Sequence, residues 1–527
     1  MQDQIETALG MEEIYALIDP PSNFLEKVKR EHLKDPTPSL KGAVANYDRM
    51  PLLRIYIQDK KDYNRLREAL AQIPEPVIPT CTGTLALHEF FLIKEFIHYY
   101  SRLRNLSRVA FWHSKFSFPD LSELAKLLDP EKSALPAFRL GPAFSNKLAA
   151  LIAQKQDIFL MLNHARHSAL EKAKTELGMP NLKEDFILSR AQKDLLANIQ
   201  SSGHFIIVSE NVANCSFRLA DSKLCLALKA ELSKLDLKLE KEENRVLKRL
   251  STQIHKAVPL LKRAKKAVAE IGLIFMLTEF GIKYKCQIPK FSKITEIKLK
   301  QARNLPLELH LNRQKRNYQA LDLEFNDHTN LITGPNMGGK TSILKTLGQM
   351  ALLARRGIPL PCESAKIPFF EHVWYNHDSS GEDGDLSSFG REVVNFSNAL
   401  QHNGFNLFLL DEFAKGTNPA EGEAIASAVL KHLGTSDGIC VAATHFSAPA
   451  LISDFAQFCI AGLDLKAFSS NKLKDISPAK RLKLLSDNMD FRLLRLKNNQ
   501  APPQCAIAVA RVLGMPEGIL TLINMEK

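Results

Sequence analysis

The sequence predicts a mixed protein in which an α/β domain follows a mainly α-helical region. Three observations predict the α/β part: a glycine-rich loop between a strand and a helix, an apolar run that ends in two acids, and another that ends in a histidine. In an open parallel sheet, the carboxyl ends of such strands share one edge, and ligands bind there. Leucines at three- and four-residue spacing predict the helical part.

The glycine-rich loop is the run Gly334-Pro335-Asn336-Met337-Gly338-Gly339-Lys340-Thr341, which fits the pattern G-x-x-x-x-G-K-[ST]. Residues 331–333 predict a short buried strand before it, and residues 342–356 predict a helix after it. Glycines let backbone N–H groups converge on phosphates, and the helix N-terminus adds positive charge. We expect Lys340 to bind the β- and γ-phosphates of ATP and Thr341 to ligate Mg²⁺, with Ser342 beside them in the cofactor site.

Two further predicted strands supply charged groups. Residues 406–412 describe a buried strand that ends in Asp411 and Glu412. We expect Asp411 to hold Mg²⁺ through water and Glu412 to polarise the attacking water. Residues 438–443 predict a third buried strand, which is followed closely by His445. We expect His445 to lie at the catalytic edge of the sheet, and the alternative is a capped surface histidine.

These motifs resemble those of the MutS superfamily, whose ATPase belongs to the ABC class. The resemblance rests on the phosphate loop, on Asp411-Glu412 followed by Lys415-Gly416-Thr417, and on the turn at residues 357–362. It includes Asp385-Leu386-Ser387-Ser388-Phe389, which resembles the family's signature segment. The resemblance implies a homodimer or heterodimer with two composite ATP sites. In each site, Ser387 and Ser388 would act on the nucleotide held by the other subunit.

Residues 501–511 and 514–517 resemble the family's C-terminal helical dimerisation element. The resemblance is specific from about residue 297 to residue 519. We therefore expect four segments: an N-terminal mainly helical region (1–80), a helical core and lever region with a minimal clamp (81–293), the P-loop ATPase domain (294–477), and the C-terminal helical dimerisation element (478–527).

The lever region carries an amphipathic pattern with coiled-coil character. The run Leu228–Leu239 has leucines at steps of four, three and four residues. We expect Pro259 to kink the helix. In the family that the chain resembles, a lever helix at this position leads to a clamp that encircles DNA. Residues 204–208 predict a strand here, which leaves only residues 209–222 for such a clamp, too few for long paired helices. A packed core helix therefore accounts for the pattern, and the lever role is implied by the resemblance alone.

The composition is that of a large globular protein with a basic surplus. The 527 residues carry a net charge of +12, which permits binding to nucleic acid. The densest cluster, residues 262–266, lies on the long helix, where a solvated face is the alternative to a phosphate-tracking stripe. The eight cysteines include no C-x-x-C pair, which argues against a zinc site or a disulfide framework. The polar, acidic start and the lack of a long apolar run predict a cytoplasmic protein.

Two functions remain open. We expect no mismatch-reading domain before the helical core and no Smr nuclease domain after the dimerisation element. The first function is an ATP-driven remodelling subunit for a protein partner. In this respect the chain resembles the reactivase subunits that serve adenosylcobalamin-dependent aminomutases such as lysine 5,6-aminomutase. Those reactivase subunits work with a MutL-like partner.

The second function is a DNA-repair or recombination ATPase that binds mismatched or branched DNA. The basic charge and the family resemblance favour this DNA function. The expected lack of a mismatch-reading domain and the short clamp segment favour the reactivase. We prefer the reactivase on these grounds, and we expect any DNA binding to lack selectivity for DNA structure. The sequence does not identify the client protein.

Overall fold

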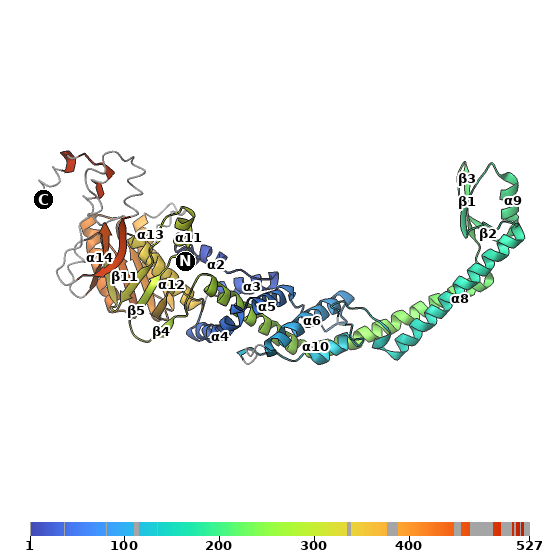
Figure 1. Cartoon of the computed structure of the whole chain (residues 1–527), viewed down its shortest axis with the longest axis horizontal. Coiled ribbons are helices and arrows are strands. Elements are labelled where there is room, and N and C mark those ends of the chain that lie inside the picture. The colour runs from blue at the N-terminus through green and yellow to red at the C-terminus, as the bar shows by residue number, and fades with distance from the viewer. Residues whose placement is uncertain are drawn as a thin grey trace. The chain divides into compact units, whose positions relative to one another are not determined.

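A computed structural model describes residues 2–35, 37–80, 82–109, 115–133, 135–334, 339–376, 388–446, 455–463, 488–496, 509–510, 513–516 and 518–520 (Figure 1). The chain forms two compact units. Unit 1 contains Met1–Gln72, Leu106–Phe116 and Val268–Lys527, and unit 2 contains Ile73–Asn105 and Ser117–Ala267. Each unit is therefore assembled from separate stretches of chain, whereas the sequence predicts four consecutive segments.

Unit 1 begins with five helices: α1 (Gln2–Ala8), α2 (Met11–Ala16), α3 (Asn23–Leu33), α4 (Leu40–Gln58) and α5 (Lys60–Gln72). Side-chain caps explain where two of them start. The Ser22 hydroxyl accepts a hydrogen bond from the backbone N–H of Leu25, and Ser39 accepts one from Gly42. Such caps satisfy N–H groups that have no partner within the helix.

The main sheet of unit 1 has six strands in the order β13-β12-β7-β11-β10-β9. Their bounds are β7 (Thr329–Thr333), β9 (His372–Tyr375), β10 (Asn406–Asp411), β11 (Gly438–Ala443), β12 (Ala456–Leu463) and β13 (Met489–Arg495). The pairs from β12 to β9 are parallel, and β13 is an antiparallel edge strand. The strands predicted at residues 331–333, 406–412 and 438–443 are confirmed as β7, β10 and β11.

One detail of the sequence prediction is wrong near the end of the chain. The sequence assigns residues 478–527 to a helical dimerisation element, but β13 falls inside this segment and completes the main sheet. Most of the residues that resemble the dimerisation element, 501–508 among them, lie outside the described residues. That element therefore stays a prediction.

Helices and a second sheet complete unit 1. The helices are α11 (Leu305–Arg313), α12 (Lys340–Arg355), α13 (Ser388–Ala399) and α14 (Pro419–Gly434). The second sheet has the order β4-β8-β5-β6, with bounds β4 (Lys290–Ser292), β5 (Ile297–Ala302), β6 (Leu321–Phe325) and β8 (Ser364–Pro368). The helix predicted at residues 342–356 is confirmed as α12, and every one of its residues from Thr346 to Arg355 is buried.

Unit 2 is built around long helices with a small α/β tip. Its elements are α6 (Leu87–Val109), α7 (Ser122–Leu128), the 3-10 helix η2 (Pro142–Phe144), α8 (Asn146–Leu177), β1 (Asp185–Ser189), α9 (Lys193–Ser202), β2 (Phe205–Glu210), β3 (Asn214–Leu219) and α10 (Lys223–Lys283). Helices α6 and α10 begin in unit 2 and end in unit 1, and α10 continues through Pro259 without a break. Across the described ranges, no helix combines the length and the apolar character needed to cross a membrane.

Residues 209–222 contain no long paired helices, as expected, but the chain forms a long helix pair elsewhere. Helix α8 has 32 residues and lies beside α10 (Figure 1). Leu151, Ile158 and Leu162 of α8 share one buried cluster with Leu228 and Leu235 of α10. The leucine pattern of α10 therefore marks a helix–helix seam, and the partner helix comes before the tip in the sequence.

The tip lies between α8 and α10 in the sequence and has its own core. Its three strands pair in the order β1-β3-β2, all antiparallel. Phe205 and Phe217 of the sheet are buried with Leu196 and Ile199 of α9. The strand predicted at residues 204–208 is confirmed as β2, and the residues expected to form a minimal clamp are part of this sheet and of the approach to α10.

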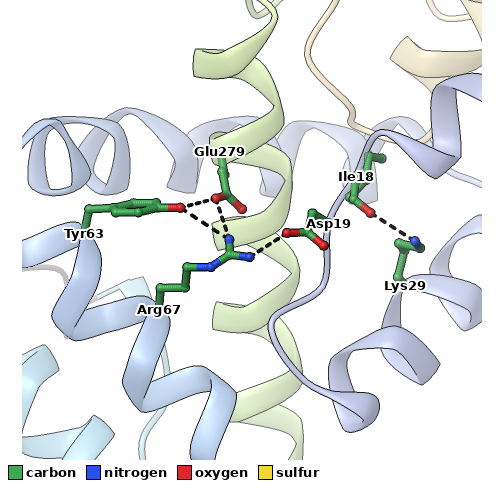
Figure 2. Close-up of polar contacts among 6 residues, drawn as sticks. All are labelled: Ile18, Asp19, Lys29, Tyr63, Arg67 and Glu279. Atoms are coloured by element: carbon green, nitrogen blue, oxygen red, sulfur yellow. Dashed lines mark hydrogen bonds and ion pairs between the residues drawn. The ribbon is translucent and has the colours of Figure 1, made fainter. Parts of the chain in front are cut away.

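In unit 1, the Glu279 carboxylate is one of the points where the N-terminal helices contact α10 (Figure 2). Glu279 of α10 accepts hydrogen bonds from the Tyr63 hydroxyl and from Arg67 Nη1, the latter at 2.6 Å. Arg67 Nη2 also donates to Asp19 Oδ2 at 2.5 Å. Lys29 Nζ donates to the carbonyl of Ile18 at 3.0 Å. These contacts join α5, α10 and the segment between α2 and α3.

The same N-terminal helices hold the carboxyl end of α12. Arg356 Nη2 donates to Glu6 Oε1 at 2.6 Å, and both side chains are buried. Burial opposes the charge on Arg356, but the neighbouring Tyr15 and Glu6 outweigh it and hold its pKa above the ordinary value. Gln349 Nε2 of α12 donates to the carbonyl of Leu9 at 2.7 Å. The helix that starts at the predicted phosphate loop is therefore fastened at its far end by the N-terminal helices.

Replacing Glu6 with alanine should leave Arg356 as a buried cation without its carboxylate. Loss of one partner of a buried ion pair costs about 3 to 5 kcal/mol. We expect a clearly lower urea midpoint for unit 1, measured by tyrosine and tryptophan fluorescence. Arg65→Ala is the control, because its pair with Asp62 is largely exposed and should contribute little. Equal midpoints for the two variants would contradict the prediction.

Candidate functional site

The strand register brings three strand ends to the same level. Ala443 of β11 is the register partner of both Ile332 in β7 and Asp411 in β10. The chain leaves these strands toward Gly334, His445 and Glu412. Because the three strands are parallel neighbours, the residues that follow them lie at one edge of the sheet. His445 therefore lies at the edge where ligands bind in such sheets, and its catalytic role stays a prediction.

The residue just before α12 must be glycine. Gly339 has φ 87°, a left-handed conformation that favours glycine. A Cβ atom at this position would lie 2.9 Å from Cδ1 of Phe491 in β13. The four residues 335–338 lie outside the described residues. Strand, flanking glycines and helix are thus present on both sides of the predicted phosphate loop.

Lys340, His445 and Glu412 are in contact at this edge. Lys340 Nζ donates to the carbonyl of Gly334 at 2.7 Å and lies 3.1 Å from His445 Nε2. His445 Nε2 lies 2.6 Å from Glu412 Oε1. Burial and the charge of Lys340 hold the pKa of His445 below its ordinary value. Nε2 thus faces an ammonium, which can only donate, and a carboxylate, which can only accept, so the tautomer of His445 decides which of the two it hydrogen-bonds.

The Glu412 carboxylate is held on both oxygens. His445 contacts Oε1, and Lys415 Nζ contacts Oε2. Burial raises the pKa of Glu412, but the hydrogen bond from Lys415 and the charges around it outweigh burial and place the pKa below its ordinary value. The carboxylate is therefore ionised at neutral pH. Each of its oxygens has two lone pairs, so one on each remains for water or substrate.

A strained turn carries Glu412. Glu412 has φ 53° and Ala414 has φ 63°, and both are left-handed values at residues other than glycine. Such residues cost about 1 to 3 kcal/mol each and persist only where the surroundings enforce them. The backbone N–H of Glu412 donates to the carbonyl of Ala443 at 2.8 Å, which ties the turn to β11.

Asn376 and Glu392 hold this turn, and neither was identified from the sequence. The Asn376 amide brackets Asp411: Oδ1 accepts its N–H, and Nδ2 donates to its carbonyl at 2.9 Å. Asn376 Nδ2 also donates to Glu392 Oε1 at 2.8 Å, and Glu392 Oε2 accepts the N–H of Ala414 at 3.0 Å. The end of β9 and helix α13 thus fix the backbone on both sides of Glu412.

Helix α14 closes the turn from the other side. A Cβ atom at Gly422 would lie 2.6 Å from the carbonyl oxygen of Ala414 and 3.1 Å from Phe446 Cζ. Asn418 caps α14 by accepting the N–H of Ala420, and proline occupies the first position of the helix. The run of residues 415–417 that carries part of the family resemblance therefore lies between the strained turn and this cap.

The remaining predicted residues fall in three places. Thr341 is exposed and Ser342 half-buried in the first turn of α12. The Tyr375 hydroxyl donates to Asp411 Oδ2 at 3.4 Å. Ser387 lies outside the described residues, and Ser388 is the first residue of α13, with its side chain outside the description. The composite site that these serines would complete stays a prediction.

The groups at this edge fit Mg²⁺ and a nucleoside triphosphate. They comprise the Lys340 ammonium, the carboxylates of Asp411 and Glu412, the Thr341 hydroxyl, and the N-terminal N–H groups of α12. Burial lowers the pKa of Lys340, while the charges of Glu412 and Asp411 oppose that shift. Asp411 and Thr341 are the candidate metal-binding residues, since both offer oxygen atoms.

Gly339→Ala tests whether the start of α12 binds nucleotide. The methyl group would meet Phe491 and strain a left-handed residue, so the helix start should shift. We expect ATP affinity to fall by about tenfold or more, equivalent to about 1.4 kcal/mol, as measured by calorimetric titration. Gly178→Ala is the matched control, because Gly178 has φ 67° but open space around it. Both variants should carry similar backbone strain, but only Gly339→Ala should lose ATP affinity. An unchanged ATP affinity in Gly339→Ala would count against a nucleotide site at the start of α12.

Comparison with known proteins places this site in a family. The family described as "MutS domain V" matches residues 330–525. The chain is 34% identical over 231 residues to the Endonuclease MutS2 of Caldanaerobacter subterraneus subsp. tengcongensis, an alignment that covers 42% of the chain and 28% of that relative. It is 26% identical over 325 residues to the Endonuclease MutS2 of Brevibacillus brevis, an alignment that covers 60% of the chain and 38% of that relative.

A third relative gives the same result. The Endonuclease MutS2 of Symbiobacterium thermophilum is 31% identical over 251 residues, 46% of this chain and 30% of the relative. The chain thus spans between about a quarter and two fifths of the length of these curated relatives. The matched domain covers α12, β10, β11 and nearly all of β7, which carry the contacts described around Lys340. Residues 330–525 are therefore similar to domain V of the MutS superfamily, and this similarity covers the part of the chain that carries the site.

Proposed function

We propose that this protein is an ATP-hydrolysing conformational switch whose cycle acts on DNA. One observation carries the ATPase part. The Glu412 carboxylate is ionised, held by His445 and Lys415, and placed at the same strand edge as Lys340. A fixed carboxylate beside a phosphate-binding lysine is the arrangement that water activation requires.

The residues divide the work as follows. Lys340 and the N–H groups at the start of α12 bind the phosphates and offset their charge. Bound Mg²⁺ supplies a positive charge that neutralises the phosphate oxygens during transfer. Glu412 orients and polarises the attacking water through its remaining lone pairs. His445 and Lys415 hold the Glu412 carboxylate in one orientation, and Asn376 and Glu392 hold the backbone that carries it.

The choice of DNA over a protein client rests on two supports. The three relatives share the printed name Endonuclease MutS2, and none of the three is named as a reactivase. The net charge of +12 gives the chain an attraction for polyanions. A reactivase, which acts on a protein client, would not need an attraction for polyanions. This proposal therefore departs from the preference for a reactivase that the sequence favoured.

Glu412→Gln tests the hydrolytic role. The amide keeps the size of the side chain but removes the charge that polarises water, so turnover should fall by about 10²-fold or more while ATP binding persists. Lys340→Ala should instead weaken ATP binding, because it removes the ammonium at the phosphates. Phosphate release and nucleotide titration measure the two effects. A Glu412→Gln chain that hydrolyses ATP at the wild-type rate would disprove the assignment.

Binding of the wild-type chain to duplex DNA tests the second half of the proposal. We expect a Kd near the micromolar range at physiological salt, with an affinity that falls steeply as salt is added. Mismatched or branched duplexes should bind within about tenfold of plain duplex, whereas a structure-specific site would differ by about 10³-fold or more. Fluorescence anisotropy over a salt series measures both. No binding at low salt would reject DNA as the ligand.

A further inference from the structure

Basic residues of α10 share one exposed face. Lys234, Lys238, Lys241, Arg245, Lys248 and Lys256 follow one another at steps of four, three, four, three and eight residues. At 3.6 residues per turn, these positions fall within a sector about 80° wide. All six side chains are exposed. We call this set the basic stripe, and Arg263 and Lys266 continue it along the same face.

The stripe is free of acidic residues. The acidic side chains of α10 between Lys234 and Lys256 are Asp236, Glu240, Glu242 and Glu243, and all project outside the sector of about 80°. A solvated helix face normally mixes both signs of charge, with pairs three or four residues apart. An ordinary solvated face, the alternative given for residues 262–266 of this helix, therefore does not account for the stripe.

The stripe also lies where the charge surplus of unit 2 is found. Residues 223–267 of α10 contain 13 Lys and Arg against 5 Asp and Glu. The rest of unit 2 contains 15 of each and is balanced. Unit 2 thus carries +8 of the chain's net charge of +12, and all of that surplus lies on one segment of one helix.

The packing of α10 keeps these cations in a fixed line. The opposite face of the helix is buried, with Leu235, Val246, Leu250 and Ile254 in the core. Within the stripe, only Arg245 has an ion-pair contact in the described parts of the chain, at 3.8 Å from the buried Glu242. The five lysines of the stripe form none there. Their ammonium groups are therefore available to an external anion.

We propose that the basic stripe binds the sugar-phosphate backbone of duplex DNA. The rise of 1.5 Å per residue gives about 33 Å between Lys234 and Lys256, close to one turn of B-DNA at about 34 Å. A rigid line of this length suits a rigid duplex. Lysine binds phosphate as a point charge and carries no sequence information.

The composition of the stripe argues against other partners. Residues 223–267 contain no Phe, Tyr or Trp. Proteins that hold single-stranded nucleic acid stack its bases on aromatic side chains. Protein–protein interfaces are enriched in aromatic residues and depleted in lysine. A lysine line without aromatic residues fits neither, and it fits the purely electrostatic part of duplex binding.

This inference rests on the DNA function proposed above, and one experiment separates the two. The triple variant Lys238→Ala/Lys241→Ala/Lys248→Ala removes three stripe cations and keeps helix-forming residues in α10. The control triple is Lys183→Ala/Lys193→Ala/Lys262→Ala, which removes the same charge from exposed positions of unit 2 outside the stripe. Circular dichroism and the melting temperature of each variant report whether the helices are intact.

We expect the stripe variant to bind a 30-base-pair duplex at least about tenfold more weakly at 150 mM salt. The slope of log K against log salt should fall by about 1 for each lysine, so by about 3 in total. The control variant should change the slope by well under 1. Equal losses in the two variants would overturn the stripe, while DNA binding itself would stand.

Two other outcomes would also decide the question. If the wild-type chain binds no duplex, the DNA function fails together with the stripe, whereas the ATPase assignment is tested separately by Glu412→Gln. If poly-glutamate competes with duplex DNA at equal charge concentration, an acidic protein replaces DNA as the partner of the stripe. Tighter binding to duplex than to poly-glutamate supports the proposal.

Discussion

The parallel order of β7, β11 and β10 is the constraint on which the site depends. A central strand in a parallel sheet has neighbours on both sides, and all three chains leave the sheet at the same edge. The register places Ile332, Ala443 and Asp411 level with one another. As a result, the lysine, the histidine and the glutamate of the site meet although they come from segments far apart in the sequence. A register slip of one residue would shift one strand by about 3.3 Å relative to its neighbour, which is enough to break the hydrogen-bond contacts among these side chains.

Strain and charge are combined at this edge. Glu412 and Ala414 adopt left-handed backbone conformations, and the side chains of Asn376 and Glu392 satisfy the backbone groups around them. The Glu412 carboxylate is then held between His445 and Lys415, which come from different parts of the chain. A loosely held carboxylate would have to be ordered anew for each attacking water. Here the cost of ordering is met during folding, which is how preorganised sites lower barriers.

The sequence predicted the parts of the site that lie next to one another in the chain. The loop from Gly334 to Thr341 and the pair Asp411-Glu412 each sit beside a strand whose apolar run is visible. Asn376 was missed because its role comes from the pairing of β9 with β10, and a single asparagine after an apolar run carries no local signal. Glu392 was missed for the same reason, since it accepts hydrogen bonds from groups on other elements.

The paired helices were missed because their seam joins distant residues: the buried positions of α8, Ile158 among them, meet partners in α10 that no single sequence window contains. The basic stripe, by contrast, is visible in the sequence once α10 is drawn as one helix, because its lysines recur mostly every three or four residues.

A line of exposed lysines affects how the protein is handled. Cell extracts contain abundant nucleic acid, and a polycation on a rigid helix exchanges its small counterions for it when salt is low. A preparation made in dilute buffer would then carry fragments of many sequences, with an absorbance ratio at 260 and 280 nm above that of protein alone. Any turnover measured on such material would describe the loaded form, so a high-salt wash is needed before the resting form can be studied.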